Sequence, residues 1–219
     1  MSTAESRRAK MVADHLRRRD IHDPRVLAAF ATVPRERFVP DALADRAYDD
    51  APLPIGEGQT ISQPYVVAIT AQALGLTGHE RVLEIGTGSG YAAAILGMLA
   101  AEVFTIERIE SLAQRAAETL AALGIENVHV HHADGTLGWP DEAPYDAIAV
   151  AAGAPAPPPA LLAQLRLGGR LVIPTGPADA QRLVRITRRS ETDYGEEDLG
   201  DVRFVPLLGE QGWPVPTPR

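Results

Sequence analysis

Ser62 raises the first chemical question, because it stands in the segment GEGQTISQPYVVA with no histidine beside it. A serine hydroxyl becomes a nucleophile when an adjacent base takes its proton. Without such a base, the Ser62 hydroxyl is suited to orienting a substrate group through a hydrogen bond. The competing interpretation is structural, since Ser62 lies two residues before Pro64 and could cap a helix that begins there. The sequence leaves both roles open, and they are compatible.

The most glycine-rich segment, VLEIGTGSGY, follows a predicted strand and opens a predicted helix. In that context a glycine loop binds a ligand, because glycine lets the backbone turn tightly and approach the ligand closely. Gly86, Gly88 and Gly90 have the spacing G-x-G-x-G. The dinucleotide fingerprint is G-x-G-x-x-G, and Tyr91 occupies its third glycine position. Glu84, just before the loop, would repel a pyrophosphate and attract a cation.

Two further acids end predicted strands. Glu107 closes EVFTIE, and Asp134 with Gly135 follows VHVHHA. In an open α/β sheet the ligand lies across the carboxyl ends of the strands, where one carboxylate can accept both hydroxyls of a ribose. A second carboxylate there can accept an exocyclic amine. With the glycine loop and Glu84, these acids fit S-adenosylmethionine better than NAD, although acids also follow strands on ordinary protein surfaces.

Strands alternate with helices from residue 81 onward, which predicts βαβ units and a parallel sheet covered on both faces. The predicted strands are RVLEIG, EVFTIE, VHVHHA, YDAIAVAA, GGRLVIPTG, RLVRITRR and VRFVPLLG. Residues 191–201, ETDYGEEDLGD, carry six acids and are expected to form a solvated hairpin or loop. The fold class is therefore α/β: a doubly wound, mostly parallel, Rossmann-like sheet of seven strands with helices on both faces.

A single domain over 1–219 is predicted, with an N-terminal helical and irregular extension over 1–63. The core is expected over 64–209 and a C-terminal tail over 210–219. A helix is expected at 4–19, and the proline-rich stretch VPRERFVPDALADRAYDDAPLPIGEGQT is expected to wrap the molecule irregularly rather than to form a core element. Trp213, in the tail, is either a lid over the site or ordinary packing.

Composition excludes several classes of protein. The net charge of −8 argues against binding to nucleic acid, and the absence of cysteine excludes disulfides, thiolate catalysis and Cys-ligated zinc. No secretory signal and no apolar run of membrane-spanning length is found, so a cytoplasmic protein without a membrane partner is expected. His129 and His131 could share a metal on one face of a strand, but no further ligand is evident, and no metal is predicted.

Several motifs together resemble the protein-L-isoaspartate O-methyltransferase family. They are GQTISQPYVVA, EIGTGSGY, the DG pair after the third strand, PAPPPALLAQL, GGRLVIPTG, VPRERFVP and DLGDVRFVPLLG. The glycine loop is common to many methyltransferases, whereas TISQP upstream of it is characteristic of this family. The resemblance runs from about residue 5 to residue 209, which is nearly the whole chain.

The resemblance implies a repair enzyme that methylates the free α-carboxylate of L-isoaspartyl residues in damaged proteins and peptides. S-adenosylmethionine would become S-adenosylhomocysteine, and the ester would then close to a succinimide. Ser62 is the implied catalytic residue. The implied cofactor-binding residues are Glu84, Gly86, Gly88, Gly90, Glu107, Asp134 and Gly135. The expected substrate-binding residues are Thr60, Ile61 and Ala151. The enzyme is expected to be a monomer.

The acceptor in that reaction is a carboxylate with a pKa near 4, which is already ionised at pH 7 and needs no base. Methyl transfer from sulfonium to carboxylate annihilates charge, so the site is expected to exclude water and align the reactants. The Ser62 hydroxyl would orient one carboxylate oxygen without neutralising it. Ala151 stands where family members often carry a small polar residue, so substrate contacts there are expected from backbone groups. Two alternatives remain: methylation of a natural-product carboxylate, and a cofactor-binding module without catalysis.

Overall fold

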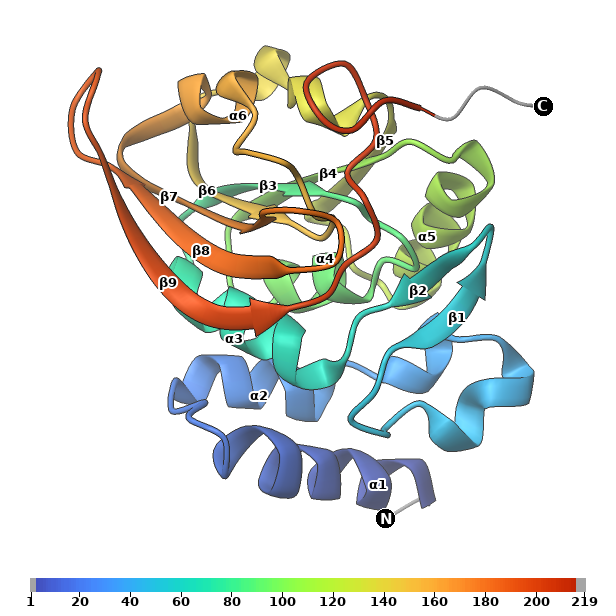
Figure 1. Cartoon of the computed structure of the whole chain (residues 1–219). Helices are drawn as coiled ribbons and strands as arrows, with labels where there is room; N and C mark the ends of the chain where they lie inside the picture. Colours follow the sequence, from blue (N-terminus) through green and yellow to red (C-terminus); the bar gives the residue numbers. More distant parts are fainter. Residues whose placement is uncertain (1–2, 216–219) are drawn as a thin grey trace.

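The computed structural model describes residues 3–215 and is built around a seven-stranded sheet (Figure 1). Its strands are β3 (Arg81–Ile85), β4 (Glu102–Glu107), β5 (Val128–His132), β6 (Tyr145–Val150), β7 (Leu165–Thr175), β8 (Gln181–Arg188) and β9 (Tyr194–Val202). They lie in the order β5-β4-β3-β6-β7-β8-β9. Neighbours from β5 to β7 are parallel, whereas β7 pairs antiparallel with β8 and β8 antiparallel with β9. The predicted mostly parallel sheet is confirmed.

Two hydrophobic cores lie on the two faces of this sheet. Val82 packs into one core and its neighbour Leu83 into the other, because successive strand residues point to opposite faces. Helices on both faces are therefore confirmed. The first core is covered by α3 (Pro64–Leu74), α4 (Tyr91–Gly97) and α5 (Glu110–Ala122), and the second by α6 (Pro159–Ala163). Within residues 3–215, no helix combines the length and apolar character needed to cross a membrane.

The N-terminal extension packs beneath α3 and α4 (Figure 1). Its elements are α1 (Thr3–Met11), the π-helical turn η1 (Val12–Arg17), α2 (Pro24–Thr32), the 3₁₀ turns η2 (Arg35–Phe38) and η3 (Asp41–Arg46), and the hairpin β1 (Leu53–Gly56) with β2 (Gln59–Ile61). The helix expected at 4–19 is thus α1 continued by η1. Asp23 caps α2, since its Oδ1 accepts the Arg25 N–H at 2.8 Å.

The proline-rich stretch after α2 is not the peripheral wrap that the sequence predicts. It contains two 3₁₀ turns and the β1–β2 hairpin, and its apolar side chains enter the first core. The buried members are Phe38, Val39, Ala47, Tyr48, Leu53 and Ile55. The prediction was wrong because short turns leave no periodic apolar pattern, although they can still direct single side chains inward.

The last strand of the sheet also differs from the prediction. The acidic stretch 191–201, expected to be a solvated hairpin or loop, forms the turn after β8 and most of β9, so it is one arm of the antiparallel β8–β9 hairpin. Residues 203–209, expected in a strand, instead cross the carboxyl ends of the other strands, where Pro206 bridges Gly153. The acids of β9 are stabilised by arginines on β8, since Arg182 pairs with Asp198 and Arg185 with Glu197. Cross-strand ion pairs of this kind let a charged sequence form an edge strand.

Candidate active site

The glycine loop joins β3 to α4 with a backbone that suits glycine. The dihedral φ is 93° at Gly86, 53° at Gly88 and 88° at Gly90, a region that side chains disfavour. At Gly90 a Cβ would also come within 3.3 Å of the Ala116 Cβ on α5. Gly86 and Gly88 line a cavity, whereas Gly90 lets α4 begin close against α5. The sequence had grouped the three glycines in one role.

Glu107, at the end of β4, holds the glycine loop from the other side. Its Oε2 accepts the Gly88 N–H at 2.9 Å, and its Oε1 accepts the Ile109 N–H at 2.9 Å. The residue is 7% exposed and lines the same cavity as the loop. A carboxylate has about four acceptor positions, so two remain. Two free acceptor positions match the two hydroxyls of a ribose.

The cavity lies over the glycine loop and the ends of β3 and β4, with an empty volume of about 920 Å³. This space includes open solvent, so the cavity is a cleft open at the surface rather than a closed chamber. The predicted site residues that line it are Thr60, Ile61, Ser62, Gly86, Gly88, Glu107, Gly135 and Ala151. The predicted residues that do not line it are Glu84, Gly90 and Asp134. The fold thus gathers Ser62, Glu107 and two loop glycines around one space.

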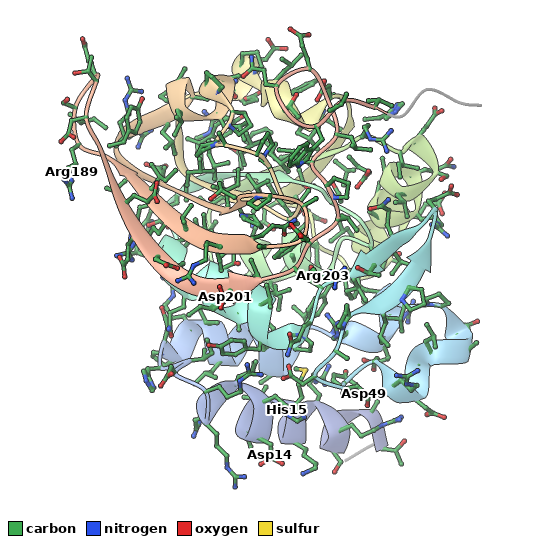
Figure 2. All side chains as sticks on the ribbon, viewed as in Figure 1. Asp14, His15, Asp49, Arg189, Asp201 and Arg203 are labelled. Atoms are coloured by element: carbon green, nitrogen blue, oxygen red, sulfur yellow. The ribbon has the colours of Figure 1, made fainter. Side chains whose placement is uncertain are left out.

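Ser62 lies where this cavity meets a groove and a smaller pocket. The same residue lines all three, and the groove runs between β2 and residues 201–205. Arg203, beyond the end of β9, lies on the groove wall opposite the β1–β2 hairpin (Figure 2). Ser62 is thus the side chain shared by the cavity over the glycine loop and a neighbouring groove.

The helix-cap interpretation of Ser62 is wrong. Gln63 is the N-cap residue of α3, and no side chain caps that helix. Within residues 3–215 the Ser62 hydroxyl makes no hydrogen bond, although the Ser62 carbonyl accepts one from Arg35. Pro64 at the first helical position favours the start of the helix, because its fixed φ suits a helix and it has no N–H that would lack a partner there. The hydroxyl is left available to a ligand.

Asp134 is engaged by its own protein. Its Oδ1 accepts the N–H and the hydroxyl of Thr136 at 2.9 and 2.7 Å, and its Oδ2 accepts the Glu210 N–H at 2.8 Å. Burial opposes ionisation of Asp134, but the Glu210 and Thr136 donors outweigh it and hold its pKa below the ordinary value. One acceptor position of the four remains. The predicted adenine contact by Asp134 is thereby limited to a single hydrogen bond.

Glu84 is almost fully buried, with 1% of the residue exposed. Its Oε2 accepts a hydrogen bond from the Thr105 hydroxyl at 2.5 Å, and the Thr105 and Thr87 hydroxyls are 2.6 Å apart. Burial raises the pKa of Glu84 to about 8; the Thr105 hydrogen bond opposes this shift, and the Glu107 charge adds to it. The carboxyl lines the small pocket that it shares with Ser62. A cation bound beside it would favour the ionised form.

Two residues that the sequence left ambiguous have clear surroundings. The Trp213 indole N–H donates to the Gly153 carbonyl at 3.0 Å, and Trp213 does not line the cavity, which favours packing over a lid. His131 stacks on Trp139 with ring centroids 4.2 Å apart. Across residues 3–215, no three side chains of His, Cys, Asp or Glu gather as metal ligands.

A family model described as protein-L-isoaspartate(D-aspartate) O-methyltransferase matches residues 6–212. The chain belongs to this family. It is 60% identical to protein-L-isoaspartate O-methyltransferase 1 of Rhodopseudomonas palustris strain HaA2, over 98% of this chain and 89% of the relative. It is 61% identical to protein-L-isoaspartate O-methyltransferase 2 of Marinobacter nauticus, over 94% of this chain and 95% of the relative.

Solved structures agree with this assignment. A protein-L-isoaspartate O-methyltransferase superposes with a TM-score of 0.84 at 29% identity, covering 94% of this chain and 67% of that one. A Plasmodium falciparum protein assigned to the same family, solved with S-adenosyl-L-homocysteine, superposes with a TM-score of 0.77 at 26% identity, covering 94% and 98%. The methyltransferase described here uses S-adenosylmethionine to methylate isoaspartyl residues, which initiates protein repair.

The C-terminal segment supplies cavity walls of the methyltransferase that the sequence analysis missed. Residues 205–208 line the cavity, and the Leu207 N–H donates to the Gly153 carbonyl at 2.8 Å. The motif VRFVPLLG had been interpreted as a strand, and no local pattern shows that it crosses the strand ends. The resemblance to the family contained the signal, because this motif was among the matching segments.

Replacing Glu84 with Gln should change how the stability of the methyltransferase depends on pH. Since the pKa of Glu84 is raised from an ordinary value of 4.5 to about 8, the folded state binds the extra proton between these pH values. Stability contributed by Glu84 is therefore present below about pH 4.5 and is lost as pH rises toward 8, by up to about 1.4 kcal/mol per pH unit.

Urea unfolding from pH 5 to pH 9 measures this effect. The difference in unfolding free energy between wild type and Glu84→Gln should fall as pH rises, and then level off above pH 8. Glu118→Gln on the exposed side of α5 is the control, because within residues 3–215 its carboxylate accepts only a hydrogen bond from Gln114. Parallel curves for wild type and Glu84→Gln would contradict the buried, protonated carboxyl.

Proposed function

We propose that Ser62 orients the isoaspartyl carboxylate at the junction between the cofactor cavity and the groove. The observation that carries this proposal is that one side chain, with an unbonded hydroxyl, lines both spaces. On the cavity side, Gly86, Gly88, Glu107 and Gly135 would hold S-adenosylmethionine, with Glu84 and Asp134 behind them. On the groove side, Thr60 and Ala151 would contact the substrate chain, and Ile61 would meet it from the cavity wall.

The reaction requires little acid–base chemistry from these residues. Bound S-adenosylmethionine supplies an electrophilic methyl group, which the ionised carboxylate of the substrate accepts in one displacement. No residue of the chain has to remove a proton, because an isoaspartyl carboxyl is ionised at pH 7. The Ser62 O–H donates to one carboxylate oxygen and leaves the other free to react. The apolar walls, including Ile61, Ile85 and Leu207, exclude water that would stabilise the separated charges.

Substrate recognition is proposed to depend mainly on the backbone of the substrate. Ala151 and Val205 lie at the meeting of cavity and groove and carry no polar side-chain atoms. A repair enzyme must accept isoaspartate within many sequences, so contacts to flanking side chains would restrict its range. Because β2 and residues 201–205 bound the groove on two sides, we expect the substrate to enter as an extended, flexible segment.

Tritium transfer from labelled S-adenosylmethionine tests this specificity. An isoaspartyl peptide should be labelled, and its aspartyl twin should not, since only the isoaspartyl residue presents a free α-carboxylate on a longer backbone. A folded protein with isoaspartate in a rigid helix should react slowly until it is unfolded. Equal labelling of the two peptides would favour a methyltransferase with another carboxylate acceptor. Equal methylation rates for the native and the unfolded protein would contradict the expectation that the substrate enters the groove as an extended segment.

We also propose that the protein is a monomer and that it acts on isoaspartyl proteins in the cytoplasm. The monomer is proposed because the predicted residues that line the cavity already surround one space within a single copy. Light scattering of the purified protein measures its mass in solution, and cell fractionation measures its compartment.

A further inference from the structure

Arg35, in the 3₁₀ turn η2, is fully buried in the N-terminal extension, with 0% of the residue exposed. A buried charge is costly unless hydrogen bonds compensate for the lost water. The Nε–H of Arg35 donates to the Ala47 carbonyl at 2.7 Å, and its Nη2–H donates to the Ser62 carbonyl at 2.8 Å. The guanidinium therefore joins the extension directly to the residue at the cavity junction.

The same guanidinium also contacts the start of α4. Its central carbon lies 4.7 Å from the centre of the Tyr91 ring, and Tyr91 follows Gly90 at the end of the glycine loop. Tyr91 itself lines the cofactor cavity. Arg35 thus connects three separate parts of the chain: the turn at Ala47, the backbone of Ser62 and the helix that begins at the glycine loop.

Stability alone does not account for an arginine at this position. Arg35 Nη1 and the Tyr91 hydroxyl are both buried, and within residues 3–215 neither makes a hydrogen bond of good geometry, although the two side chains interact electrostatically. Buried polar groups that are only partly satisfied are less stable than apolar side chains of similar volume. A polar group kept in a core at a cost in stability points to a functional role.

We propose that Arg35 is a positioning residue that fixes the Ser62 backbone relative to the glycine loop. The inference rests on the proposed role of Ser62. A guanidinium suits the task because its donors point in fixed directions from a rigid plane, whereas a lysine has one flexible ammonium. A second tether acts beside it, since Gln63 Nε2 donates to Asp50 Oδ2 at 2.8 Å. Small displacements of a catalytic group can cost about a hundredfold in rate, so the tether matters for turnover.

Arg35→Met and Arg35→Lys are the test variants, and Arg25→Met is the matched control. Arg25 also joins the extension to the core through two carbonyls, with Nη1 2.7 Å from the Leu76 oxygen and Nη2 3.2 Å from the Leu99 oxygen. Arg25 lines none of the cavities that include Ser62. Arg35→Met should lower kcat about tenfold or more, and Arg35→Lys should lower it at least threefold. For both variants the Kd of S-adenosylmethionine, measured by calorimetry, should stay within about threefold of the wild-type value. Arg25→Met should lower the melting temperature without lowering kcat.

A double-mutant cycle distinguishes positioning from general destabilisation. If Arg35 acts through Ser62, then Arg35→Lys should slow the wild type but have no further effect on Ser62→Ala. An equal slowing in both backgrounds would overturn the Arg35 proposal and leave the proposed function intact. Normal turnover of Ser62→Ala alone would overturn both. If Arg35→Met fails to fold, Arg35→Lys decides, and wild-type kcat in that variant would overturn the positioning role.

Discussion

Glu107→Ala should weaken the binding of S-adenosylmethionine by at least about a hundredfold. The Glu107 carboxylate has two acceptor positions left after binding the Gly88 and Ile109 N–H groups. Charge-assisted hydrogen bonds to a ribose are worth about 1.5–3 kcal/mol each, so losing two costs about 3 kcal/mol or more. Each 1.4 kcal/mol is a factor of ten in affinity. Calorimetric titration of the folded variant measures the change.

Two further variants sharpen this experiment. Glu107→Gln keeps one acceptor oxygen without the charge, so its affinity should lie between those of wild type and Glu107→Ala. Glu110→Ala, in the exposed first turn of α5, removes a nearby carboxylate that does not line the cavity, and its affinity should match wild type. An unchanged affinity in Glu107→Ala, with an unchanged melting temperature, would mean that Glu107 does not bind the ribose.

Ser62→Ala should lower kcat by about tenfold or more and leave stability nearly unchanged. The hydroxyl makes no hydrogen bond within residues 3–215 and does not cap α3, so its removal should change the unfolding free energy by only about 0.5 kcal/mol. A hydrogen bond that orients the acceptor in the transition state acts on the rate, where each 1.36 kcal/mol is a factor of ten. Ser190→Ala, in the turn between β8 and β9, is the control with normal turnover.

The pH dependence of the same two enzymes separates orientation from base catalysis. With both substrates saturating, kcat should be flat from about pH 6 to 8 in wild type and in Ser62→Ala, because the acceptor is already ionised. The titration of Glu84 belongs to the free enzyme and should affect kcat/KM for the cofactor instead. A rise of kcat with a midpoint near pH 7 would mean that a base takes part.

Local sequence patterns predicted the parts of this fold that local physics determines. The alternation of strands and helices, the glycine loop after β3 and the position of Glu107 at the end of β4 all follow from residue type and spacing within short windows. The carboxyl ends of neighbouring parallel strands must meet at one edge of the sheet, so the sequence alone predicts that Glu107 lies close to the glycine loop.

Contacts between distant residues could not be predicted in this way. The bond from Arg35 to the Ser62 carbonyl, and the bond from the Glu210 N–H to Asp134, depend on how loops pack and not on periodicity. The sequence left a hairpin or a loop open for the acidic stretch, because the pairing of β9 depends on its register with β8, where arginines face the acids. A run of acids alone has the composition of a solvated loop.

The acids of β9 have a further consequence, because this strand forms one of the two edges of the sheet. Glu196, Glu197 and Asp198 are exposed there, and an open edge offers unpaired N–H and C=O groups to any extended chain. Charged side chains along an edge oppose such additions and the aggregation that follows them. A repair enzyme constantly meets loosened, partly unfolded polypeptides. We therefore expect the acidic edge to oppose the addition of such polypeptides to the sheet, so that their contacts with the enzyme outside the proposed groove stay brief and reversible.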